Sequence, residues 1–223
     1  MINKDYILRL FERFGRELSI ILGLRQRNRQ EDALIHIDDL LLQAIGLSSR
    51  FIDTLSPEML LAILSPMGRL NVESCLWAAF LLKNEGDIYE AMGQSKESYY
   101  RYIKALLLLL EVQLREPVAD EMEITRNTAD LLKKLEDFDL PHFLKNALFA
   151  YYEQQGHYSK AEDYLFEMLE DMPGDTDLVK RGIEFYMRLL KKNDFDLQSG
   201  DLPRQEVEEG LAQLRRMKKG PVH

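Results

Sequence analysis

Residues 86–105 read GDIYEAMGQSKESYYRYIKA, and residues 149–168, FAYYEQQGHYSKAEDYLFEM, repeat their spacing. The positions that correspond agree in residue type or in size: Tyr89 with Tyr152, Gly93 with Gly156, and Ser98 with Ala161. In each copy the glycine follows an apolar helical run and can adopt the positive φ that ends a helix. Each copy therefore predicts two antiparallel helices joined by a short turn.

The side chains around each turn predict how the paired helices pack. Ser98 and Ala161 have little bulk where the two helices of a hairpin should lie closest. Tyr89 and Tyr152 supply large rings that fill the space beside them. We predict helical hairpins over residues 71–115 and over residues 141–173.

A fainter copy precedes these two. If Ala33 takes the place of Ser98, then Asn28 falls at the turn, and asparagine tolerates the left-handed conformation better than most residues. This copy covers residues 3–45. The copies are separated by 65 and 63 residues, far more than the roughly 34 residues of a contiguous array of helical hairpins. Each unit therefore has room for one added helix.

The recurring glycines, tyrosines and small residues resemble the tetratricopeptide repeat. The resemblance implies an all-α fold of tetratricopeptide-like antiparallel hairpins, stacked in a short right-handed superhelix and here joined by added helices. No clear break divides the chain, so we expect a single domain over residues 1–223. Residues 193–202 are the best linker candidate, and the polar amphipathic segment 203–218 is expected to cap the C-terminal end.

One segment is apolar on all sides. Residues 105–110 read ALLLLL, whereas a helix with one side in water shows a polar stripe. This segment is predicted to be a central core helix. The alternative is a surface for self-association.

Composition is that of a folded protein in a reducing compartment. The 223 residues are 46% hydrophobic and 30% charged, which is ordinary for a globular chain. Cys75 is the single cysteine and cannot form an internal disulfide. We see neither an apolar secretory segment at the start nor an apolar run long enough to span a membrane. We expect a cytoplasmic protein without membrane contact.

Charge is unevenly distributed. The net charge is −9, yet residues 1–30 carry seven basic and three acidic residues. Arg9, Arg13 and Arg16 share one helix face. This face could bind phosphates or an acidic partner, although a solvated face or pairing with acids of the same chain is the simpler interpretation. The acidic total argues against nucleic acid as a partner.

Catalytic patterns are scarce. The sequence lacks a glycine-rich phosphate loop, a paired-histidine zinc motif, a Gly-x-Ser-x-Gly elbow and a cysteine pair. We therefore expect neither an enzyme nor a cofactor or metal. The alternative is an enzyme or a metal-binding protein that uses His36 with Asp32 and Asp39, or His157 with Glu153, since helical spacing groups these side chains.

The resemblance to tetratricopeptide repeats also implies a binding surface, because the first helix of each hairpin would line a concave face. The matching positions are Phe80, Lys83, Asp87, Glu90, Phe143, Asn146, Ala150 and Glu153. An aromatic anchor with polar neighbours can bind an extended peptide or a helix. Members that bind acidic chain termini carry Asn where Asp87 stands, which argues against such a ligand. The alternative is that added helices cover these positions.

The whole chain resembles a bacterial family of tetratricopeptide-like proteins of unknown function, through residues 4–16, 86–89 and 202–211. This resemblance implies no catalytic residue. We therefore expect a non-catalytic scaffold for binding or assembly, with a protein or peptide partner. The alternative is a homo-oligomeric structural protein.

Overall fold

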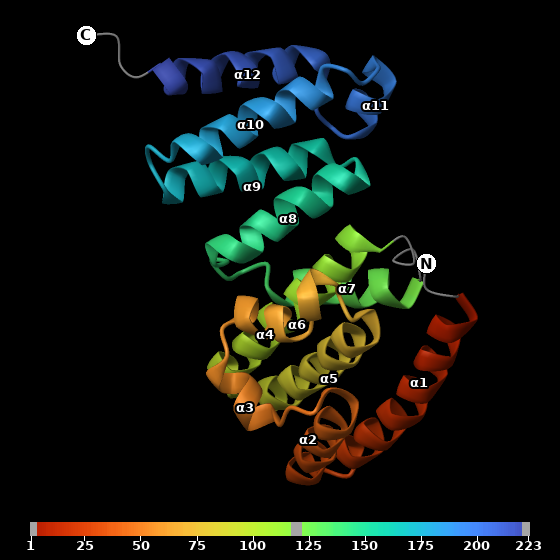
Figure 1. Ribbon diagram of the computed structural model, residues 1–223. Coiled ribbons are helices and arrows are strands. Elements are labelled where there is room, and N and C mark those ends of the chain that lie inside the picture. The colour runs from red at the N-terminus through yellow and green to blue at the C-terminus, as the bar shows by residue number, and fades with distance from the viewer. Residues whose placement is uncertain (1–3, 117–121, 220–223) are drawn as a thin grey trace. The chain divides into compact units, whose positions relative to one another are not determined.

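A computed structural model describes residues 4–116 and 122–219 (Figure 1). Twelve α-helices and one short 3-10 helix account for the regular structure of these residues, and they include no strand. The all-α prediction is confirmed. The chain divides into two compact units, Met1–Asp139 (unit 1) and Leu140–His223 (unit 2). The predicted single domain over residues 1–223 includes both units, and that they form one domain stays a prediction.

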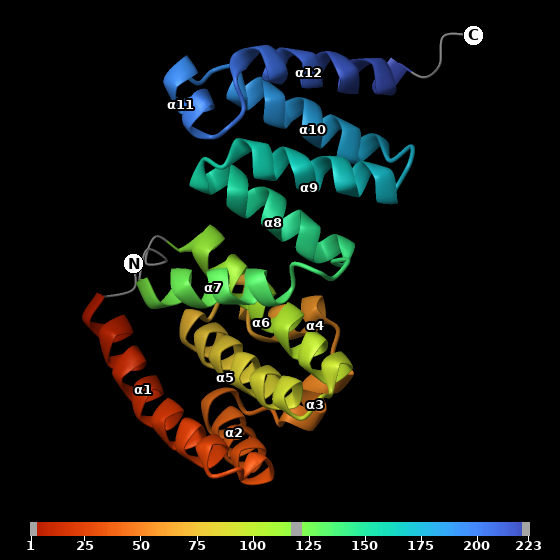
Figure 2. The same cartoon turned by 180° about the vertical axis from the view of Figure 1, so that it is seen from behind.

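Unit 1 is built around the antiparallel pair α5 and α6 (Figures 1 and 2). Its helices are α1 (Lys4–Gln26), α2 (Gln30–Ile45), α3 (Ser49–Thr54), α4 (Pro57–Ile63), the 3-10 helix η1 (Pro66–Gly68), α5 (Val72–Ala91), α6 (Ser95–Arg115) and α7 (Met122–Lys134). Asn71 caps α5, since its Oδ1 accepts a hydrogen bond from the Ser74 amide at 3.1 Å. Gly93 follows α5 with φ +74°, and Ser98 is buried.

The apolar segment of α6 lies in the core of unit 1. Residues 105–110 are each at most 4% exposed. Neighbouring helices of the same chain therefore surround this segment, as predicted for a core helix. It does not offer a surface for self-association.

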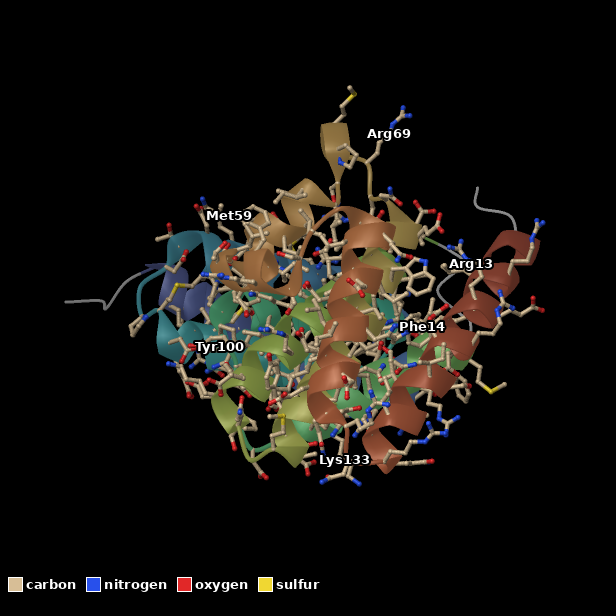
Figure 3. The ribbon with its side chains drawn as sticks, turned by 90° about the horizontal axis from the view of Figure 1, so that it is seen from below. Arg13, Phe14, Met59, Arg69, Tyr100 and Lys133 are labelled. Carbon is tan, nitrogen blue, oxygen red and sulfur yellow. The ribbon has the colours of Figure 1, made fainter. Side chains whose placement is uncertain are left out.

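The helices α1 and α2 form a second hairpin in unit 1. Asn28 adopts φ +59° at the turn, and the Arg29 amide donates to the Leu24 carbonyl at 3.0 Å. Ala33 is fully buried, as its alignment with Ser98 predicts. On α1, Phe14 points into the unit, and its ring centroid lies 5.8 Å from that of Trp77 (Figure 3).

Unit 2 is a succession of helices packed side by side (Figures 1 and 2). They are α8 (His142–Gln155), α9 (Tyr158–Asp171), α10 (Thr176–Leu189), α11 (Asp194–Ser199) and α12 (Arg204–Lys219). Gly156 follows α8 with φ +78°, and Ala161 on α9 is fully buried. α8 and α9 therefore occupy the segment for which the sequence predicts the hairpin over residues 141–173.

Two glycines allow α10 and α12 to pack closely. A Cβ atom on Gly182 would lie 2.4 Å from Leu214 Cδ1, and one on Gly210 would lie 2.3 Å from the Tyr186 ring. α12 buries Val207, Leu211 and Leu214 on one face, and its opposite face is largely polar. This is the one-sided polarity expected of a capping helix.

The predicted linker over residues 193–202 is wrong, because it contains α11. Asn193 caps this helix, since its Oδ1 accepts from the Asp196 amide at 2.8 Å. Leu197 is fully buried. The polar composition of the segment reflects a cap and an exposed helix face, while Leu197, Gly200 and Leu202 are buried and hold the segment against the rest of unit 2.

Candidate functional site

The predicted binding positions of unit 1 contact neighbouring helices of the same unit, and among them only Glu90 is exposed. Phe80 on α5 is 1% exposed. Its ring centroid lies 5.6 Å from that of Phe11 and 4.7 Å from that of Phe14, both on α1. Such contacts are those of a core aromatic residue. The structure therefore places Phe80 in the interior of unit 1 and not on an open face.

Lys83, Asp87 and Glu90 on α5 pair with α7. Lys83 Nζ lies 2.7 Å from Asp130 Oδ2. Lys134 Nζ lies 3.2 Å from Asp87 Oδ1 and 2.7 Å from Glu90 Oε2. Two residues of α7, the acidic Asp130 and the basic Lys134, thus form ion pairs with three of the predicted positions.

Tyr102 on α6 also hydrogen-bonds to the acids of this network. Its hydroxyl donates to Asp87 Oδ1 at 2.8 Å and approaches Glu90 Oε2 at 3.1 Å. Burial and the nearby Asp87 carboxylate raise the pKa of Tyr102. The phenol therefore stays protonated and acts as a hydrogen-bond donor throughout the physiological range.

The corresponding positions of unit 2 pair with α10. The guanidinium of Arg188 donates to both carboxylate oxygens of Glu153, at 2.7 and 2.9 Å. Arg181 donates to Asn146 Oδ1, and its guanidinium carbon lies 4.8 Å from the centroid of the Phe149 ring. Glu153 corresponds to Glu90, and Asn146 to Lys83. In both units, therefore, the helix that follows the hairpin, α7 or α10, bonds through its side chains to the matched positions on the first helix of that hairpin.

The two units differ in whether the aromatic side chain of the set is exposed. In unit 2, Phe143, Asn146, Ala150 and Glu153 all remain partly exposed. We call the surface formed by these four residues together with Arg181 and Arg188 the α8–α10 face. It combines an aromatic side chain with charged groups and an amide, whereas α1 buries the aromatic member of the matching set in unit 1. The α8–α10 face is therefore the candidate binding site.

Sequence reasoning missed a buried polar cluster in unit 1. Arg101 on α6 donates through Nε to Glu85 and through Nη1 and Nη2 to Asp53 on α3. The Ser49 hydroxyl also bonds to Glu85, and Lys104 Nζ donates to the Ile52 carbonyl at 2.7 Å. We call these side chains the Arg101 cluster.

The Arg101 cluster joins α3 to α5 and α6. Glu85 and Arg101 are almost fully buried, at 2% and 3% exposed. Burial is the main reason why the pKa of the Glu85 carboxyl is raised. Arg101 pairs with both acids of the cluster, and Asp53 is the member that stays exposed. The sequence carries no distinctive signal for the cluster, because Glu85 stands among other polar residues, Lys83, Asn84 and Asp87.

The two histidines considered as metal ligands have different neighbours. His36 Nε2 lies 3.0 Å from Glu17 Oε2 on α1. His157 precedes α9 and is exposed. Among the residues that the structure describes, no group of three or more His, Cys, Asp or Glu side chains is arranged to hold a metal ion. The lone thiol, Cys75, is fully buried, and burial raises its pKa to about 12, so it is protonated at neutral pH.

The arginine row on α1 is partly engaged within the chain. Arg13 lies 3.5 Å from Glu73 on α5, and its guanidinium carbon lies 5.6 Å from the centroid of the Trp77 ring (Figure 3). This contact matches the prediction that the row pairs with acids of the same chain. Arg16 is exposed. Across the described residues, no helix is both long enough and apolar enough to cross a bilayer.

Comparisons with known proteins identify the family but not the activity. No curated protein and no solved structure matches this chain. Residues 1–219 match a family of unknown function, DUF6483. This match agrees with the resemblance to a family of unknown function that the sequence suggested. Since the match covers nearly the whole sequence, the chain belongs to the DUF6483 family.

Proposed function

We propose that this chain is a non-catalytic binding module of the bacterial cytoplasm, with tetratricopeptide-like hairpins that stack as a short right-handed superhelix. Its ligand is a protein or a peptide. Support comes from the two hairpins with positive-φ glycines at matched positions and from the third helix that bridges each of them. A family of unknown function adds no activity to this proposal.

The α8–α10 face carries the proposal. Phe143 is a partly exposed aromatic side chain on the same helix face as Asn146, which lies one turn further along. Aromatic residues and arginines are the side chains that most often dominate the energy of protein interfaces. Arg181 and Arg188 each present a planar set of donors that suits carboxylates and backbone carbonyls. An extended segment with an apolar side chain and nearby acceptors fits this set.

The Glu153–Arg188 pair allows a sharp test. Exchange of the two residues, Glu153→Arg with Arg188→Glu, keeps an ion pair between α8 and α10 but reverses the charges that a ligand meets. A matched control exchanges Asp177 and Lys180 on the exposed surface of α10, whose charged atoms lie 2.8 Å apart. Both variants keep the net charge and the composition of the wild-type chain.

The measurement is affinity capture from lysate with the full-length chain as bait. We expect the wild type and the Asp177/Lys180 exchange to recover the same protein reproducibly, and the Glu153/Arg188 exchange to lose it. Circular dichroism verifies that all three baits have the same helix content. Equal recovery by all three baits would exclude the α8–α10 face as the binding site.

A further inference from the structure

The outward faces of α1 and α2 carry opposite charge. On α1, Arg9, Arg13 and Arg16 lie along the exposed side, and Ile20 continues their line at 48% exposed. α2 contains neither Lys nor Arg. Its exposed acids are Glu31 and Asp39, whereas Asp32 pairs with Arg29 and Asp38 accepts a hydrogen bond from the Ser49 amide. Figure 3 looks onto these two helices, which lie side by side at this surface of unit 1.

Exposed apolar residues interrupt the acidic face of α2. Ile35 is 61% exposed and Leu42 is 46% exposed, and they lie seven residues apart on one side of the helix. Asp39 is exposed between them. Their side lies opposite the buried face formed by Ala33, Ile37 and Leu40. Together with Ile20 on α1, these residues give the outward face of the hairpin exposed apolar side chains beside its charges.

We propose that a second copy of this chain docks on the α1–α2 hairpin. A two-fold axis parallel to the helices would place α1 of one copy against α2 of the other, twice, so that a basic face meets an acidic face on both sides. Pairing of α1 with α1, or of α2 with α2, would oppose like charges. The hairpin is thus complementary to itself, and the product is a bundle of four antiparallel helices.

The register of this bundle follows from the hairpin itself. His36 on α2 lies level with Glu17 on α1, as their 3.0 Å contact shows. A two-fold axis along the helices preserves these heights. Arg16 of one copy then lies level with Asp39 of the other, to within about one helical turn, and Ile20 lies level with Ile35. The bundle would therefore pair Arg16 with Asp39 and Ile20 with Ile35, and all four residues are exposed in the single chain.

Unit 2 offers no comparable surface on its last helix. Among the described side chains of α12, Met217 is the one large apolar residue that is exposed, and the acids Glu206, Glu208 and Glu209 lie two or more turns away from it. The proposed dimer therefore uses residues of unit 1. Self-association goes beyond the proposed ligand binding and does not depend on it.

Charge reversal tests the proposal by light scattering after gel filtration and by sedimentation velocity of the full-length chain. The wild type should be a dimer at micromolar concentration. Arg16→Glu alone and Asp39→Lys alone should each raise the dissociation constant about tenfold or more, because each opposes like charges at two symmetric places. Ile35→Asp should give a monomer. Arg215→Glu and Glu208→Lys on α12 are matched controls and should remain dimers.

The decisive experiment mixes the two single variants. In a heterodimer of Arg16→Glu with Asp39→Lys, one pair of contacts is reversed and the other is unchanged, so both are attractive. Mixing should restore the wild-type dissociation constant. A wild-type chain that stays monomeric at 100 μM, roughly a hundred times the concentration range of a stable dimer, would overturn the proposal. So would dimers that all three unit 1 variants leave intact, or single variants that fail to recover when mixed.

Discussion

Gly86 on α5 lies against the ring of Tyr102 on α6, so that a Cβ atom at residue 86 would sit 2.5 Å from Tyr102 Cε1. The ring cannot retreat easily, because Tyr102 is 2% exposed and its hydroxyl bonds to Asp87 and Glu90. The close packing of α5 against α6 therefore requires glycine at residue 86, one helical turn before Tyr89 of the repeat pattern.

We expect Gly86→Ala to destabilise the protein. Alanine favours a helix interior by up to about 1 kcal/mol over glycine, but the clash with the ring costs about 1–3 kcal/mol. The free energy of unfolding in urea measures the balance. Gly15→Ala on α1 is the control, since no atom lies within 4 Å of its added Cβ. It should raise stability slightly, and an equal gain at residue 86 would contradict the packing described for α5 and α6.

Replacement of Arg101 should release α3. Arg101→Met leaves Glu85 buried without its cationic partner, which typically costs about 3–5 kcal/mol. Hydrogen exchange of the α3 amides should accelerate more than that of α6, because Asp53 and Ser49 lose their contact with Arg101. Lys180→Met, at an exposed pair on α10, should change neither quantity noticeably. Unchanged exchange in α3 would show that apolar packing alone holds this helix.

Glu85 should make stability depend on pH in a defined direction. Its pKa in the folded state is raised above the ordinary value of 4.5, mainly by burial, so the folded state holds this proton more tightly than the unfolded chain does. The contribution of Glu85 to stability is therefore greatest in acid and declines as the pH rises from 4.5 through the folded-state pKa. In Glu85→Gln this decline is absent. The difference in unfolding free energy between variant and wild type should shift in favour of the variant as pH rises, and urea titrations at several pH values would show a constant difference if Glu85 did not titrate in this way.

Cys75 should be unreactive in the folded protein. It is fully buried, and burial raises its pKa to about 12, so little thiolate forms at pH 8. A thiol reagent such as Ellman's reagent should label the native chain far more slowly than the chain in urea. Rapid labelling without denaturant would mean that α5 opens readily, because Cys75 lies on its inner side.

Much of the helical pattern could be predicted from sequence, since it rests on local signals. Gly93 and Gly156 adopt the positive φ expected of residues that end a helix, and Asn71 and Ser56 cap helices through their side chains. The short helix α3 was not predicted. Its six residues are held by distant partners such as Arg101, and nothing within them shows that contact.

Only part of the candidate site could be predicted from the sequence. The repeat register led to Glu90 and Glu153, and both proved to be equivalent positions that a later helix bridges. The identity of the bridging residues, Lys134 and Arg188, was not accessible, because they come from helices whose placement depends on tertiary packing. The same limit applies to α10 and α12, where Gly182 is a mid-helix glycine whose role becomes visible only against its neighbour.

The bridge between Arg188 and Glu153 gives ligand binding on the α8–α10 face the character of an exchange reaction. An incoming carboxylate gains Arg188 only as Glu153 gives it up, so the number of ion pairs is the same before and after. Affinity on this face would then come largely from apolar contact at Phe143 and would vary weakly with ionic strength, whereas the placement of the positive charge at Arg188 would decide which ligands bind. Glu153 would compete for Arg188 with every acidic ligand, so a ligand that carries a carboxylate but does not fit the shape of the face would fail to bind.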